Sequence, residues 1–174
     1  PAGEKERPTE LYARAKGTTA ASFTASGDLW YTSTAAYKNL YDRDDIYFVP
    51  SGVKVPRGDE AERRRITYGQ RTPIVDVRAD GKQVVFVVNA HGTTFLEIAD
   101  VGPDHGLQNK RDLVPSQRFE QVYTPRFSPD GRLVAVSRWA GARVTLLDPA
   151  DGMDLATVPT ADHPCDLVFS PDGA

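Results

Sequence analysis

The chain has 174 residues, of which 40% are hydrophobic and 26% are charged, and its formal net charge is −3. This length and composition are typical of an ordinary globular domain with a hydrophobic core. The negative balance argues against nucleic acid as a partner, because phosphate binding needs a basic surface. The one basic run, Arg63-Arg64-Arg65, follows three acidic residues at 59, 60 and 62 and is therefore locally balanced.

Neither a membrane span nor an internal disulfide is expected. No apolar run approaches the roughly 20 residues that cross a bilayer. The polar start, Pro1-Ala2-Gly3-Glu4-Lys5-Glu6-Arg7, lacks the apolar centre of a targeting signal. Cys165 is the single cysteine, and we expect it to behave as a small buried hydrophobic residue.

In chain order, a polar segment at 1–19 comes first, and we interpret it as a remnant of a preceding repeat. Residues 20–69 then predict a first unit of four strands. Its first strand is Ala21-Ser22-Phe23, which a Ser26-Gly27 turn follows. The other three strands are predicted at 29–32, 45–49 and 64–68, with a loop insert at 34–44, because β-branched and aromatic residues dominate these runs.

Two further units repeat this order. The second, 70–117, has its turn at Asp80-Gly81 and the third, 118–160, has its turn at Ser128-Pro129-Asp130-Gly131. Residues 161–174 repeat the start of a fourth unit, with a second Ser-Pro-Asp-Gly turn 42 residues after the first. The strands after each first strand are predicted at 83–88, 94–99 and 111–114 in the second unit, and at 133–137, 143–147 and 155–158 in the third.

The turn residues have a physical reason to recur. Proline presets φ near −65°, aspartate bonds neighbouring backbone N–H groups, and glycine accepts the positive φ that closes a hairpin. Phe127, directly before the third turn, is expected to pack between neighbouring sheets. No stretch shows a sustained helical period, so the fold class is predicted to be all-β.

Four short antiparallel strands per repeat indicate β-propeller blades. The residues 125–132, Pro-Arg-Phe-Ser-Pro-Asp-Gly-Arg, followed by Val-Ala-Val-Ser and Val-Thr-Leu-Leu-Asp, resemble the WD40-like PD40 repeat of TolB-type propellers. The resemblance covers about 22–174 and is strongest at 123–149 and 163–173. It implies a partial β-propeller of three four-stranded blades plus the first strand of a fourth.

The resemblance also implies a function. TolB-like propellers occur in the bacterial cell envelope as protein-interaction scaffolds, so we expect a non-catalytic protein- or peptide-binding module in the periplasm or envelope. Very similar blades gate or support the active sites of prolyl-oligopeptidase-type and tricorn-type peptidases. The alternative is therefore the propeller domain of a prolyl-oligopeptidase-, tricorn- or zinc-peptidase-associated protein whose catalytic domain lies outside this chain.

No catalytic, cofactor or metal residues are predicted. The chain has no Gly-x-Ser-x-Gly nucleophile elbow, and Ser128 and Ser170 are expected to cap turns. His91, His105 and His163 lack zinc-site spacing. The acidic run 42–45 lacks the glycine and distal glutamate of a calcium loop.

The candidate binding residues are expected near the central channel of the propeller. His163 and Asp166 fall where Tyr123 falls one repeat earlier, at the entry to a first strand. Trp139, just past a strand, is expected to be exposed and to contact a partner.

Three loops, 34–44, 89–93 and 101–110, are expected to serve the same binding face, with a protein or peptide as partner. The open ends of an unclosed array also predict self-association.

Overall fold

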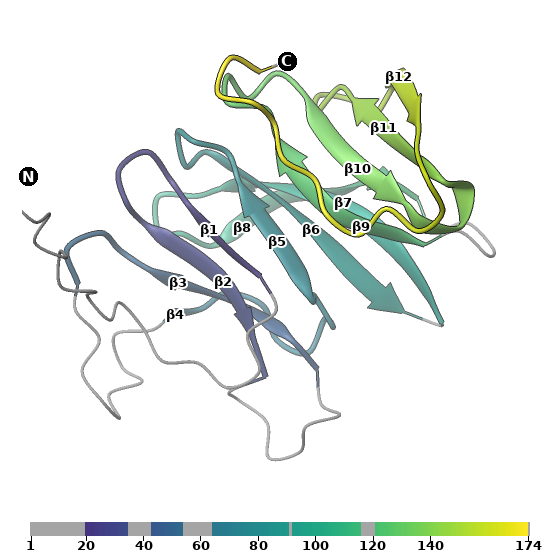
Figure 1. Ribbon diagram of the computed structural model, residues 1–174. Coiled ribbons are helices and arrows are strands. Elements are labelled where there is room, and N and C mark those ends of the chain that lie inside the picture. The colour runs from purple at the N-terminus through teal and green to yellow at the C-terminus, as the bar shows by residue number, and fades with distance from the viewer. Residues whose placement is uncertain (1–19, 35–42, 54–63, 91, 116–120, 174) are drawn as a thin grey trace, which may run out of the picture.

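The computed structural model describes residues 20–34, 43–53, 64–90, 92–115 and 121–173. In this part of the chain, three four-stranded antiparallel sheets lie side by side, and the only helical element is a short 3₁₀ turn, η1 (Trp139–Gly141) (Figure 1). The predicted segment 1–19, the centre of the 34–44 insert and His91 lie outside the described residues.

Each sheet uses its four strands in chain order. The first contains β1 (Ala21–Phe23), β2 (Leu29–Ser33), β3 (Asp45–Val49) and β4 (Arg64–Arg65). The second contains β5 (Ile74–Val77), β6 (Gln83–Ala90), β7 (Thr93–Val101) and β8 (Leu107–Val114). The third contains β9 (Val122–Phe127), β10 (Val134–Arg138), β11 (Arg143–Leu147) and β12 (Asp154–Pro159). The predicted all-β partial propeller is thereby confirmed.

The second and third strands of each unit match the prediction closely, and the differences lie at the edges. β4 is only two residues long instead of five, whereas β8 begins four residues earlier than expected, at Leu107. The expected first strand of a fourth blade is not formed as a strand within 161–173. A ladder needs a hydrogen-bonded neighbour, and none of the described strands pairs with this segment.

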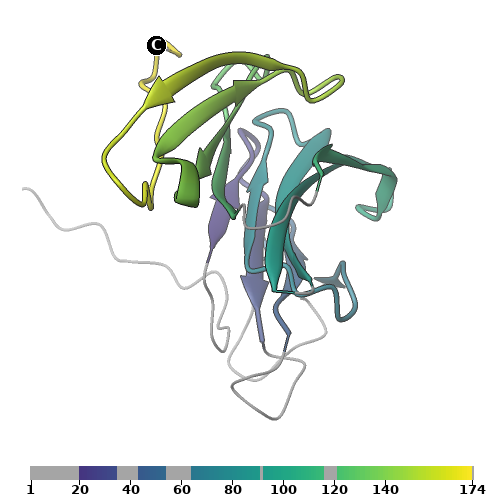
Figure 2. The same ribbon diagram turned by 90° about the vertical axis from the view of Figure 1, so that its right-hand side faces the viewer.

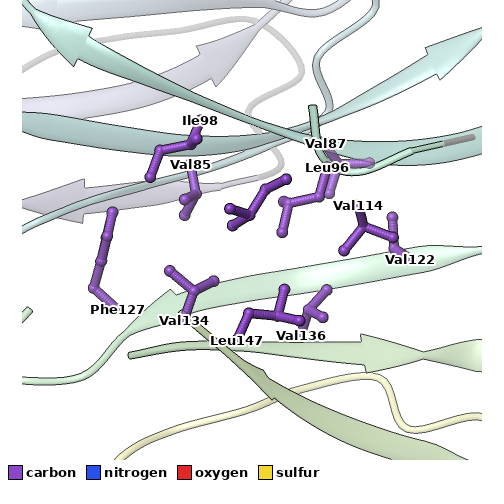
Figure 3. Packing of buried hydrophobic residues seen from close by; sticks show 11 residues of the cluster. Val85, Val87, Leu96, Ile98, Val114, Val122, Phe127, Val134, Val136 and Leu147 are labelled. Carbon is purple, nitrogen blue, oxygen red and sulfur yellow. The ribbon is translucent and has the colours of Figure 1, made fainter. Parts of the chain in front are cut away.

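The core lies between the sheets. The sequence of β6 is continuously apolar because both faces of the second sheet are covered. Val85 and Val87 pack toward the third sheet, whereas Val84, Phe86 and Val88 pack toward the first. Successive side chains of a strand point to opposite faces, so a sheet that is covered on both faces needs apolar residues at every position. Figure 3 shows the first of these layers, in which Val85, Val87 and their sheet neighbours face Phe127, Val134 and Leu147.

The two outer faces of the array differ. On the first sheet, Leu29, Tyr31, Tyr47 and Val49 are all buried on the side away from the second sheet. On the third sheet every residue of β12 is exposed. The C-terminal side also carries exposed apolar side chains, among them Val168, which is 92% exposed.

The Ser-Pro-Asp-Gly turns have the predicted geometry. Ser128 Oγ donates to Asp130 Oδ1 at 2.6 Å, and the Arg132 N–H donates to the same oxygen at 3.0 Å. Gly131 has φ of 72° and Gly173 has φ of 81°, values that glycine adopts without strain. Hydrogen bonds from Ser128 and Arg132 hold the pKa of Asp130 below its usual value.

The first strands β1, β5 and β9 lie next to one another and are tied together by one carboxylate. Asp76 of β5 accepts a hydrogen bond from Ser22 Oγ of β1 at 2.7 Å. Its second oxygen accepts the backbone N–H of Phe127 in β9, also at 2.7 Å. The Val77 N–H donates to Ser22 Oγ at 3.3 Å. One side chain therefore joins all three sheets.

Asp76 is only 8% exposed, and burial raises its pKa despite the opposing hydrogen bonds from Phe127 and Ser22. A carboxyl group whose folded pKa is raised favours folding most when it is protonated. Its contribution is complete below the unfolded-state value near 3.8 and is lost as the pH rises through the folded value.

We predict opposite results for two substitutions of Asp76. Asp76→Ala leaves the buried Phe127 N–H without its acceptor and lowers the free energy of unfolding by about 1–3 kcal/mol. Asp76→Asn keeps one acceptor oxygen and removes the charge that burial disfavours. Its stability relative to the native chain should therefore increase between about pH 3 and about pH 7. Urea unfolding at both pH values measures both effects, and a pH-independent difference for Asp76→Asn would contradict the assignment.

Candidate functional site

The antiparallel order of the third sheet brings three chain segments to one end. β9 starts here at Val122, β10 finishes here at Arg138, and β12 finishes here at Pro159. We call this the strand-entry end and define it by residues 121–123, 139–142 and 160–163. The Ser-Pro-Asp-Gly turn lies at the other end of the same strands. In Figure 2 the yellow C-terminal segment turns back at the strand-entry end, beside the third sheet.

Three aromatic rings meet at the strand-entry end. The ring centroids of Tyr123 and Trp139 are 6.3 Å apart in an edge-on arrangement, and those of Trp139 and His163 are 4.1 Å apart. Tyr123 Oη also donates to Gln121 Oε1 at 3.2 Å. Trp139 remains 38% exposed, as predicted. Three of the four candidate residues are therefore neighbours, although their sequence positions span 41 residues.

The local backbone explains how the rings come together. The register between β9 and β10 shifts between Ala135 and Ser137, and Thr124 in β9 has a positive φ of 47°. This irregularity adds a residue to β9 and turns Tyr123 toward the same sheet face as Arg126. His163 also has a positive φ, 59°, where the chain returns from β12.

Asp166, the fourth candidate, lies farther along the returning segment. One carboxylate oxygen is 3.9 Å from Arg126 Nη2, and the Asp166 side chain is 85% exposed. Nearby, Thr124 Oγ1 donates to the backbone carbonyl of Cys165 at 2.9 Å. The prediction that Cys165 is buried is wrong, because its side chain is exposed. No described sheet covers the outer side of this segment.

The three loops expected on one binding face do not share a face. The ends of the β6–β7 hairpin, Ala90 and Thr93, and the described ends of the 34–44 insert lie at the corresponding end of their own sheets, since β6 and β2 finish there and β7 and β3 start there. The β7–β8 connection at 102–106 lies at the opposite end, next to the Asp80-Gly81 turn. Successive hairpins of a meander alternate between ends, so the loop prediction was wrong for 101–110.

The β7–β8 connection instead joins the first and second sheets. His105 stacks on Phe48 with ring centroids 4.0 Å apart, and Asp104 forms an ion pair with Arg64 at 3.1 Å. Beside this contact lies a cavity of about 360 Å³, whose lining includes Trp30, Asp28 and Lys82 as well as both stacked rings. No local pattern in the sequence predicts this cavity, because its walls come from four separate segments.

The acidic run 42–45 contributes to a salt bridge and hydrogen bonds. Asp45 is fully buried. Its two oxygens accept hydrogen bonds from Arg65, at 2.6 and 3.0 Å, and from Thr67 Oγ1 and the Gly69 N–H, at 3.0 and 2.7 Å. No group of three metal-ligating side chains occurs among the described residues. The same residues include no helix that is long and apolar enough to cross a membrane.

Comparison with known proteins shows a TolB-like β-propeller fold. A structure described as TolB from Agrobacterium tumefaciens is 20% identical over 87% of this chain and 54% of its own, with a TM-score of 0.63. TolB from Acinetobacter baumannii is 17% identical over 90% of this chain and 36% of its own, with a TM-score of 0.62. A mutant of puromycin hydrolase in complex with PGG is 19% identical over 85% of this chain and 24% of its own, with a TM-score of 0.57.

The chain thus spans little more than half, or less, of the structures that it matches. At these identities the likeness establishes the fold. No protein-family model matches the sequence, and no curated protein matches it.

We predict that His163 shields Trp139 from solvent, because the centroids of the two rings are 4.1 Å apart. Acrylamide quenches exposed indoles, so its effect reports mainly on Trp139, which is 38% exposed, and little on Trp30, which is 1% exposed. His163→Ala should increase the quenching at constant pH, whereas the matched control Tyr68→Ala should leave it unchanged. Equal quenching of His163→Ala and of the native chain would show that the two rings do not meet in solution.

Proposed function

We propose that the chain is a non-catalytic protein- or peptide-binding module, built on a TolB-like propeller and acting in a bacterial envelope protein. The observation that carries this proposal is the aromatic group of Tyr123, Trp139 and His163 at the strand-entry end. Exposed tryptophan and tyrosine side chains are the residues that most often dominate the binding energy of protein interfaces.

The support beneath these rings suits a binding role. Trp139 follows directly from β10, and Tyr123 lies in β9, a strand joined to the rest of the array through Asp76. Side chains on such rigid strands lose little conformational entropy when a ligand binds, so more of the contact energy becomes affinity. Under this proposal Tyr123, His163 and Asp166 face the propeller channel, and the 34–44 and 89–93 loops border it.

An envelope location is part of the proposal. It is supported by the TolB structures among the neighbours.

The puromycin hydrolase neighbour favours a second candidate, the propeller domain of a peptidase. In that case a catalytic domain would be encoded elsewhere in the same gene. A hydrolase assay on the 174-residue chain should be blank under both candidates. The gene sequence on either side of this segment separates them, since only the second candidate requires a serine-hydrolase or zinc-peptidase domain there.

Selection of a displayed random peptide library on the native chain tests the proposed function. Peptides should be enriched, and Trp139→Ala should weaken their binding by about 10-fold or more. Tyr68→Ala is the matched control, because Tyr68 is a 73% exposed aromatic residue in the segment that follows β4, and it should leave the affinity unchanged. The proposal fails if no peptide is enriched, or if the enriched peptides bind Trp139→Ala as tightly as the native chain.

A further inference from the structure

Three residues occupy the same position in successive first strands. Ser22, Asp76 and Arg126 each stand one residue before the last apolar residue of the strand, which is Phe23, Val77 or Phe127. The register supports this equivalence. Phe23, Val77 and Phe127 each pair with the first or second residue of the following strand, Leu29, Val84 or Val134.

At the first two junctions the side chain at this position supplies an acceptor for the next first strand. Ser22 Oγ accepts the N–H of Val77 at 3.3 Å, and Asp76 Oδ2 accepts the N–H of Phe127 at 2.7 Å. Val77 and Phe127 are themselves equivalent residues. The same hydrogen bond therefore joins β1 to β5 and β5 to β9, with a neutral side chain as acceptor in the first case and a carboxylate in the second.

The third junction breaks this rule. A guanidinium group has five N–H donors and no acceptor, so Arg126 cannot accept the N–H of Phe169, the next equivalent residue. The segment 163–173, which returns from β12, nevertheless lies beside β9, where the first strand of a next blade would lie. Cys165 accepts from Thr124 Oγ1 at 2.9 Å, and a Cβ on Gly173 would lie 3.9 Å from Pro129 of the preceding turn. The segment follows β9 along its length without forming the acceptor contact.

Arg126 has few partners of its own. In the described part of the chain its guanidinium donates to the carbonyl of the adjacent Pro125 at 3.2 Å and lies 3.9 Å from Asp166. The latter distance is too long for a hydrogen bond, and the Arg126 side chain is 30% exposed. The charge of Arg126 also opposes the rise in the pKa of Asp76, but both oxygens of Asp76 already accept hydrogen bonds, from Ser22 and Phe127.

We propose that Arg126 binds a carboxylate of the ligand that the aromatic group receives; this inference rests on the proposed function. A guanidinium offers two parallel N–H donors that match the two oxygens of a carboxylate. Arg126 and Tyr123 face the same side of the third sheet, since their partners in β10, Ala135 and Ser137, are two residues apart. A peptide could therefore place an aromatic side chain against Trp139 and a carboxylate at Arg126.

Asp166 acts as an internal competitor in this arrangement. Its carboxylate forms an ion pair with the guanidinium at 3.9 Å. It is highly exposed and also accepts the N–H of Leu167 at 2.8 Å. Such exposed ion pairs contribute little, so an incoming carboxylate with bidentate geometry displaces Asp166. Neutralising Asp166 should therefore strengthen the binding of an anionic ligand, whereas neutralising Arg126 should weaken it.

Three tripeptides test the proposal by titration of Trp139 fluorescence in the native chain. The probes are N-acetyl-Ala-Phe-Ala with a free carboxylate, the same peptide as its C-terminal amide, and N-acetyl-Ala-Phe-Glu amide. The free acid should bind about 10-fold more tightly than the plain amide, in keeping with a charged hydrogen bond. The glutamate amide distinguishes a side-chain carboxylate from a terminal one. Its affinity equals that of the free acid only if Arg126 can bind a side-chain carboxylate.

Matched variants assign the effect to Arg126. Arg126→Gln should abolish the difference between acid and amide, Arg126→Lys should retain part of it, and Asp166→Asn should enlarge it by about 2- to 5-fold. Thermal melting of Arg126→Ser, which restores the residue type of the first junction, checks that loss of the guanidinium leaves the fold intact.

Equal affinities of the three peptides for the native chain would overturn the carboxylate inference, as would an acid preference that survives Arg126→Gln. Failure of all three peptides to bind would also overturn it. The peptide-library selection decides the proposed function separately, because its result depends on Trp139 and needs no carboxylate.

Discussion

The hydrogen bonds of Asp76 are the constraint on which the arrangement of the three sheets depends. Apolar contacts between sheets are strong, but they have no direction and allow neighbouring sheets to slide. A buried carboxylate that accepts from Ser22 on one side and from the Phe127 N–H on the other fixes the height of each first strand relative to the next. The positions of the strand ends, and hence of the loops that extend from them, follow from this alignment.

The aromatic group is a consequence of that alignment and of one local irregularity. β9 must stay level with β5 at Phe127, so the extra residue near Thr124 shifts only the part of β9 beyond it. Tyr123 thereby reaches Trp139, and the return of the chain from β12 adds His163. The candidate site therefore needs both a rigid reference point and a departure from regular pairing.

The sequence was sufficient for the fold because repeated turns recur at a consistent place relative to apolar strands. Phe127 and the glycine turns lie where their residue types predicted. Prediction failed where a residue's surroundings come from distant segments. Cys165 was expected to be buried, but the strand that would cover it is not among the described ones. The end of the sheet at which the loop 101–110 lies depends on how many hairpins precede it, which no local pattern shows. The contact of His105 with Phe48 joins residues 57 positions apart, so it too has no local sequence signal.

The two-faced core of the second sheet has a consequence for how its strand register is chosen. In most sheets a one-residue slip is prevented because it would move polar side chains inward. Within Val84–Val88 every residue is apolar, so a slip would exchange the residues of the two cores without exposing any charge. Hydrophobic patterning therefore cannot select the register of β6. The short turns at either end of β6 and the polar Asp76, which pairs with Val85, must therefore select the register. A single charged residue thus decides which apolar side chains of β6 enter which of the two cores.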